Sequence, residues 1–146
     1  MAAASSSTLS SPSNNSKPAL LYKFKITLND RDDPRGGRWR RVIAPANFSL
    51  LELHVVIQVV FGWANYHLHH FIRHRGPRGF WYNPESTEYS IIDEEFEPCF
   101  AESKEERICK LCDVFSELDP VLDYEYDFGA SWELEVKFEG EFKRHI

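Results

Sequence analysis

Three histidines and one aspartate have residue types and spacings that could hold a metal ion. His67 and His69 are two residues apart, so a strand would place both rings on one face, and His54 falls on the inward stripe of an expected helix. Imidazole nitrogens and a carboxylate oxygen are ligands that zinc takes in tetrahedral sites, with Asp127 as the fourth ligand here. Histidines that are hydrogen-bonded inside a core are the alternative that we favour, and no other cofactor is expected.

A second candidate for metal or redox chemistry is the pair Cys109 and Cys112. A structural zinc site usually needs two such pairs, and Cys99 is the one further cysteine in the sequence. A thioredoxin-like role expects the pair at a helix start within a βαβ pattern, which the surrounding sequence lacks. Buried structural thiols are therefore favoured, and three cysteines are too few for a disulfide scaffold.

Arginines gather in the first half of the chain and could contact an anionic partner. Of the 17 Lys and Arg residues, 11 lie in residues 1–84, whereas residues 85–146 hold 19 of the 23 Asp and Glu residues. Basic runs are typical of nucleic-acid contacts, but in a chain of net charge −6 the two halves can also pair with each other. We favour internal pairing. The alternative is a surface for nucleic acid or another anion, made of Arg35, Arg38, Arg40 and Arg41.

Alternating apolar residues predict the strands that would position these side chains. The acidic stretch 83–106 has no such period and is expected to be irregular, while residues 107–115 could hold a short strand and a helical turn from about Cys112. The last two expected strands form an antiparallel hairpin. The expected strands are 20–28, 38–44, 67–74, 80–82, 122–128 and 132–139.

One helix is expected over residues 49–61. Ser49 and Glu52 have the spacing of a capping box, and Gly62 is a natural left-handed terminator. Its apolar stripe predicts that the helix is buried against a sheet. The expected fold class is therefore α+β: a mainly antiparallel sheet of about five to six strands, with this one main helix packed on one face. Residues 20–146 would form a single domain.

Strand 20–28 is expected to lie beside strand 132–139 or its hairpin partner. Lys23 and Lys25 would face outward and offset the acidic outer face of the hairpin. The inward side chains Tyr22, Phe24, Ile26 and Leu28 would match the apolar face made by Trp132, Leu134, Val136 and Phe138. This placement would join both ends of the chain in one sheet.

The first 19 residues are mostly Ala, Ser, Asn and Pro, and we expect them to form a disordered tail. They lack the basic start and apolar stretch of a secretory signal. No apolar run reaches the ~18–20 residues that a membrane-spanning helix needs. A soluble protein of the cytoplasm is expected, or of the nucleus if the source is a eukaryote, with no membrane partner.

Three segments carry a family resemblance. They are Trp39-Arg40-Arg41, then Leu53-His54-x-x-Ile57-Gln58-x-x-x-Gly62-Trp63-x-x-x-His67-Leu68-His69-x-Phe71, then Tyr124-x-Tyr126-Asp127-Phe128-Gly129-x-x-Trp132. In order and spacing they resemble the plasmid pRiA4b ORF-three-like domain family. The resemblance covers roughly residues 21–139 and implies an α+β fold, an unknown biochemical function, and genes found on plasmids or beside transposon genes.

The four candidate metal ligands all match positions of this family pattern. The chain departs from the pattern at two places: it has extra residues before Trp39, and it has Ala130 and Leu134 where the family often has Asp and His. We therefore expect a small non-catalytic accessory or interaction domain of mobile-element type, whose partner would be a protein or a nucleic acid. The alternative is a metal-dependent enzyme with a His-lined cleft between helix and sheet.

Overall fold

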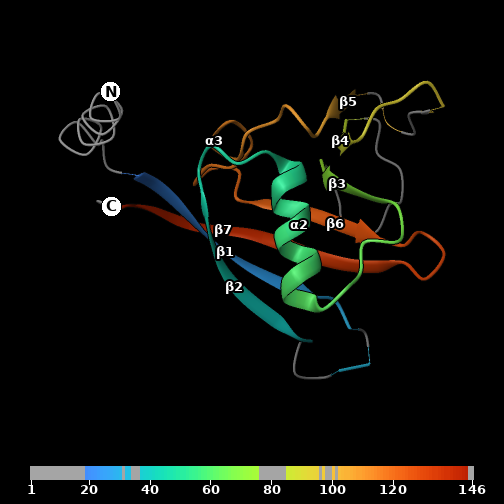
Figure 1. Cartoon of the computed structure of the whole chain (residues 1–146), viewed down its shortest axis with the longest axis horizontal. Coiled ribbons are helices and arrows are strands. Elements are labelled where there is room, and N and C mark those ends of the chain that lie inside the picture. Colours follow the sequence, from blue (N-terminus) through green and yellow to red (C-terminus); the bar gives the residue numbers. More distant parts are fainter. Residues whose placement is uncertain are drawn as a thin grey trace, which may run out of the picture.

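Seven strands join in one sheet, in the order β2-β1-β7-β6-β3-β4-β5 (Figure 1). The computed structural model describes residues 19–30, 32–33, 37–75, 85–95, 97, 100 and 102–144. Every neighbouring pair of strands is antiparallel except β4 and β5, which run parallel. The strands are β1 (Ala19–Leu28), β2 (Trp39–Pro45), β3 (His69–Arg73), β4 (Thr87–Ser90), β5 (Glu102–Glu105), β6 (Val121–Tyr126) and β7 (Trp132–Arg144).

The expected fold class, an α+β domain with five to six mainly antiparallel strands, is wrong. The described chain is mostly sheet, with seven strands in a mixed sheet and two short helices, α2 (Leu50–Phe61) and α3 (Leu111–Val114). The error lies in the stretch expected to be irregular, which holds β4 and β5. All four residues of β4 are buried, so it shows no alternation, and the β5 sequence Glu-Ser-Lys-Glu has no apolar residue.

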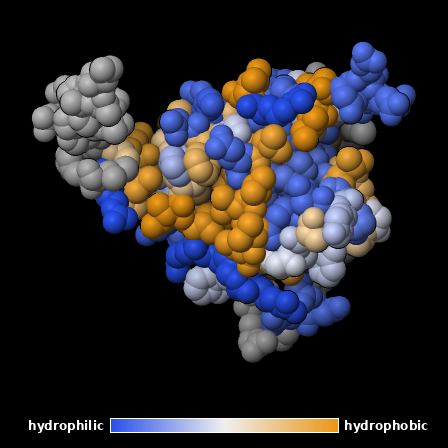
Figure 2. Space-filling model, viewed as in Figure 1, coloured by the Kyte–Doolittle hydropathy of each residue, from blue (hydrophilic) through white to orange (hydrophobic). Residues whose placement is uncertain are grey.

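Helix α2 begins and ends where its capping residues predict. The Ser49 side chain accepts the Glu52 N–H at 3.2 Å, and Glu52 Oε1 accepts the Ser49 N–H at 3.1 Å. Gly62 ends the helix at φ 72°, in the left-handed region. Leu50, Leu53 and Ile57 are fully buried against the sheet. The outer side is apolar as well: Figure 2 shows apolar side chains gathered over α2, where Val55 and Val59 are 49% and 72% exposed.

The predicted neighbourhood of the first and last strands is confirmed. β1 lies between β2 and β7, and Phe24, Ile26 and Leu28 stand opposite Phe138, Val136 and Leu134. The charge argument behind that prediction holds only at Glu139: its pKa is lowered by the hydrogen bond from Arg41 and also by the charges of Lys23 and Lys25. Directly across the strands, Lys25 stands opposite Lys137 on one side and Arg41 on the other. The apolar face therefore sets this pairing.

Of the remaining predicted segments, one matches an observed helix to within a residue and two lie outside the described residues. The helical turn expected from about Cys112 is α3, which begins at Leu111. The expected strand 80–82 and the expected tail, up to residue 18, lie outside the described residues. Within the described part of the chain, no helix is long and apolar enough to cross a membrane.

Candidate ligand pocket

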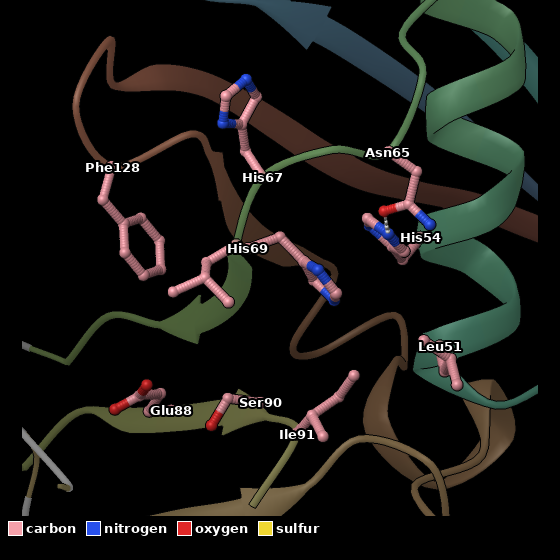
Figure 3. Close-up of a pocket in the computed structure, with 10 residues that line it drawn as sticks. Leu51, His54, Asn65, His67, His69, Glu88, Ser90, Ile91 and Phe128 are labelled. Atoms are coloured by element: carbon pink, nitrogen blue, oxygen red, sulfur yellow. Dashed lines mark hydrogen bonds between the residues drawn. The ribbon is translucent and has the colours of Figure 1, made fainter. Parts of the chain in front are cut away.

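A pocket of about 250 Å³ lies where β3 and β4 diverge (Figure 3). The two strands pair only from Phe71 to Arg73, so the first residues of β3 pair with β6 alone, while Ser90 at the end of β4 pairs with β5. In Figure 3 the β4 residues line one wall, and α2 closes another side. The lining residues are Leu51, His54, Asn65, His67, Leu68, His69, Glu88, Ser90, Ile91 and Phe128.

His54 is held by a chain of hydrogen bonds behind the pocket. Gln58 Oε1 accepts the Asn65 backbone N–H, so Gln58 Nε2 donates to the Tyr124 hydroxyl at 2.9 Å. The Tyr124 hydroxyl then donates to His54 Nδ1 at 2.8 Å, and His54 Nε2 donates to Asn65 Oδ1 at 2.8 Å. This assignment leaves His54 neutral, with both ring nitrogens hydrogen-bonded.

The electrostatics agree with a neutral His54. Burial, followed by the nearby His69 ring, lowers the pKa of His54 to about 4. The two imidazole rings stack with their centroids 3.4 Å apart. Burial also raises the pKa of Tyr124, so its hydroxyl keeps its proton.

His69 shares a proton with a fully buried carboxyl group. Its Nε2 lies 2.7 Å from Glu106 Oε1 and 2.9 Å from Oε2, with hydrogen-bond geometry to Oε2. Burial raises the pKa of Glu106 to about 8 and lowers the pKa of His69 to about 4. At neutral pH the carboxylic acid therefore donates to a neutral imidazole, because a charged pair would cost desolvation energy.

On the opposite face of β3, His70 lies between two carboxylates. Its Nδ1 is 3.3 Å from Glu88 Oε1, and its Nε2 is 2.9 Å from Glu125 Oε1. The three side chains are only 7–12% exposed. The second oxygen of Glu125 accepts the Ser131 hydroxyl at 2.7 Å. The second oxygen of Glu88 has no hydrogen-bond partner among the residues that the structure describes.

Buried polar atoms without partners concentrate at the β4 wall. Within the described part of the chain, four buried side-chain oxygens have no hydrogen-bond partner: Glu88 Oε2, Ser90 Oγ, Ser103 Oγ and Glu106 Oε1. Glu88 and Ser103 stand opposite each other in the β4–β5 register, and Ser90 lies two residues beyond Glu88. Native interiors leave few such atoms unpaired, so this wall carries a local cost in stability.

The structure brings the four candidate metal ligands together only in part. His54 and His69 stack, while His67 Nε2 lies 3.6 Å from Asp127 Oδ2 and its side chain is half exposed. Among the described residues, no three His, Cys, Asp or Glu side chains form a group that could hold a metal ion. The zinc site stays a prediction from sequence.

Two of the candidate arginines, Arg40 and Arg41, lie on different faces of the sheet. Arg40 and Arg41 are neighbours in β2 and therefore point to opposite faces: Arg40 lies over the Phe61 ring, and Arg41 pairs with Glu139 at 3.0 Å. Arg38 is exposed beside β2, and Arg35 lies outside the described residues, as does Cys99. Cys109 is half-buried and Cys112 is exposed, and both are free thiols.

Sequence reasoning missed most partners of the histidines. Glu106 and Glu88, which contact His69 and His70, fall in the stretch that was expected to be irregular. Gln58 offered a signal, because it is a polar residue one turn after His54 on the inward stripe of α2. A buried amide at that spacing needs hydrogen-bond partners in the core, as Tyr124 and Asn65 provide.

This chain is similar to a curated protein, to a solved structure and to a family model. The uncharacterized protein y4hQ of Sinorhizobium fredii (strain NBRC 101917 / NGR234) is 30% identical over 124 residues, which are 85% of this chain and 56% of y4hQ. The crystal structure of MM3350 from Methanosarcina mazei Go1, a protein of unknown function, matches with a TM-score of 0.70 and 28% identity over 88% of this chain and 65% of that one. The chain thus spans less than two thirds of both relatives. The family model of the plasmid pRiA4b ORF-3-like protein matches residues 20–145, so the chain belongs to that family.

Proposed function

We propose that the domain is a non-catalytic binding module that takes a small ligand into the pocket between β3, β4 and α2. The observation that carries the proposal is the pocket itself, about 250 Å³ in volume, beside which two buried polar atoms, Glu88 Oε2 and Ser90 Oγ, have no hydrogen-bond partner among the described residues. An unpaired buried polar atom costs roughly 1–3 kcal/mol, which a bound molecule would recover.

The size of the pocket supports a small ligand. A volume of about 250 Å³ is the share of about eight water molecules in the liquid, which is more than one bridging water needs. It lies below the roughly 300–1,000 Å³ of pockets that hold drug-sized molecules. The expected ligand therefore has only a few non-hydrogen atoms inside the pocket.

Binding can be tested by ¹⁵N-edited NMR with four small probes: n-butylammonium, butyrate, butan-1-ol and acetamide. We expect at least one probe to shift the backbone amides of Leu68, Ser90 and Ile91 in a saturable way, with little change at Ile43 on the distant edge strand β2. If none of the four probes shifts the pocket amides at millimolar concentration, the proposal is wrong.

Two neighbouring isoleucines offer a matched pair of variants. Ile91 lines the pocket, whereas Ile92 does not, and they are 39% and 36% exposed. Ile91→Trp should fill the pocket and abolish the probe-induced shifts, and Ile92→Trp should leave them unchanged. Equal loss in both variants would indicate that the probe binds elsewhere.

A second candidate is the metal-dependent enzyme with a His-lined cleft. In its favour, His54, His67 and His69 all line one pocket between helix and sheet. Zinc at His54 would have to replace a hydrogen bond to Tyr124 or Asn65. Metal analysis of freshly purified protein tests it: about one equivalent of zinc, lost in a His67→Ala variant, would favour the enzyme, and metal-free protein that melts identically with and without chelator would exclude it.

The mobile-element role is carried by the family resemblance alone. If its gene lies on plasmids or beside transposons, the domain would act within a larger assembly. Both relatives are longer than the matched region, so they have room for further segments that could take part in such an assembly. Comparing the gene neighbourhoods of close relatives tests this part. Neighbours without plasmid or transposon genes would contradict it.

A further inference from the structure

We propose that the open face of the sheet, the face away from α2, is an interface between two copies of this chain related by a two-fold axis. Figure 1 shows α2 lying across the other face, and Phe115 at the end of α3 contacts Phe24 on that side as well. Within the described part of the chain, no helix covers the open face. Its charged side chains on β1 and β7 are exposed or half-buried. Because this surface lies away from α2, the proposal does not depend on a ligand in the pocket.

A row of cations crosses the open face at β2, β1 and β7. Lys25 stands opposite Arg41 on one side and Lys137 on the other, and we call these three residues the basic row. Glu139 pairs with Arg41 at 3.0 Å, so one acid offsets part of the row. The three cations still stand side by side, and like charges directly across strands destabilise a sheet.

A row of acids lies beside the basic row, two residues along the strands. Glu135 lies two residues before Lys137 on β7 and stands opposite Asp123, and we call these two acids the acidic row. The next outward pair, Glu125 and Glu133, is acidic too. In the registers of β1 with β2 and β7, and of β6 with β7, every pair of two charged residues has the same sign. Opposite signs would stabilise a face that meets only water, so this pattern favours a partner that brings the opposite charge to each row.

A second copy brings the opposite charge to both rows. A two-fold axis that runs across the strands, midway between the rows, lays each strand over the same strand of the second copy in the opposite direction. Lys137 then faces Glu135 of the second copy, and Glu135 faces Lys137 of the second copy. Trp39 is 47% exposed and lies in line with the acidic row, so the same rotation brings it to Arg41 of the second copy for a cation–π contact. A nucleic acid, in contrast, would match the basic row and be repelled by the acidic row.

The first test is the oligomeric state of the wild-type protein, measured by analytical ultracentrifugation. At about 0.1 mM protein we expect a dimer, whose dissociation constant rises at least about tenfold between about 0.05 and 0.5 M NaCl because salt screens the paired rows. A monomer at every salt concentration would overturn the proposal, and so would a dimer whose affinity does not depend on salt. A wild-type monomer that binds a short oligonucleotide would assign the basic row to an anionic partner instead.

Two charge-reversed variants test the rows themselves. Lys25→Glu with Lys137→Glu reverses the basic row, and Glu133→Lys with Glu135→Lys reverses the acids of β7. Each variant alone should be monomeric, because rows of the same sign would then face each other. An equimolar mixture of the two should form a one-to-one heterodimer, because each variant then supplies the charge that the other needs. A homodimer of either variant, or a mixture of the two folded variants that stays monomeric, would contradict the proposed interface.

The apolar outer side of α2 provides the matched control. Val59 is 72% exposed on that side, away from the open face. Val59→Glu should therefore keep the wild-type dimer and its salt dependence. Loss of the dimer in this variant, together with dimers in both charge-reversed variants, would place the interface on α2 and overturn the proposal.

Discussion

Three titratable side chains behind the pocket are held in their neutral forms by burial. Glu106 is expected to keep its proton up to about pH 8, and His54 and His69 to stay unprotonated down to about pH 4. Each shift relative to the unfolded chain makes stability depend on pH. The two residue types act in opposite directions, so they predict a stability maximum.

The first prediction is this maximum, near pH 6.5. The folded pKa of both histidines lies below the unfolded value of 6.5, so their contribution is present above pH 6.5 and lost as the pH falls through about 4. The folded pKa of Glu106 lies above its unfolded value of 4.5, so its contribution is present below pH 4.5 and lost as the pH rises through about 8. Below pH 6.5 the two histidines outweigh the one glutamate.

Urea denaturation at several pH values checks this maximum. Between pH 6.5 and 8 the free energy of unfolding should fall by about 2 kcal/mol in the wild type. In a Glu106→Gln variant this fall should disappear, because glutamine does not titrate. A fall of the same size in the variant would mean that other groups cause it.

The second prediction concerns the Tyr124 hydroxyl. Tyr124→Phe leaves Gln58 Nε2 and His54 Nδ1 without their shared partner, so the free energy of unfolding should drop by about 1–3 kcal/mol. Tyr126→Phe is the control, because its hydroxyl accepts the N–H of Tyr66, a residue 86% exposed that can turn to water. Equal losses in both variants would show that the buried network contributes no more to the free energy of unfolding than the single hydrogen bond from Tyr66.

At the scale of elements, the sequence predicts what alternates or has capping residues. β1, β6 and β7 have one buried face, and α2 has Ser49, Glu52 and Gly62 at its ends. β4 and β5 escape prediction because β4 is buried on both faces and β5 has no apolar residue. The prediction of the site was incomplete for the same reason. The sequence indicated the histidines, but Glu106, Glu88 and Ser90 lie in or beside the two strands that it did not predict.

The third prediction concerns the capping box of α2. Ser49→Ala removes the acceptor of the Glu52 N–H, and the free energy of unfolding should fall by about 1 kcal/mol. Ser49→Asp keeps an acceptor at the same place and should retain most of the stability. Denaturation of both variants checks the helix start, and no difference between them would mean that the cap contributes little.

At the scale of the whole molecule, the first and last strands of the described chain, β1 and β7, pair side by side within the sheet. Ala19 stands opposite Arg144, and the Tyr22 ring lies 4.6 Å from the Phe138 ring. The apolar match of these strands was readable from sequence, but their register was not. Lys25, expected to face acids, stands opposite Lys137 and Arg41, and Lys23 stands opposite Gly140 and Ile43. The alternation of apolar and polar residues shows which face of a strand is buried. Which residues of neighbouring strands stand opposite each other is set by the register of the folded sheet.

The fourth prediction follows from the pairing of β1 with β7. Deletion of residues 1–18 should change the free energy of unfolding by less than about 0.5 kcal/mol, because the described sheet begins at Ala19. Deletion of residues 1–22 removes four residues paired with β7 and should lower the melting temperature clearly. A large effect of the shorter deletion would show that the expected tail contributes to the fold.

The central claim is that the pocket between β3, β4 and α2 takes a small ligand. High-resolution crystal structures of the protein with each of the four small probes test it most directly. The claim predicts that at least one probe is ordered in the pocket, against Leu68 and Ile91. A pocket that holds none of the four probes would contradict the claim.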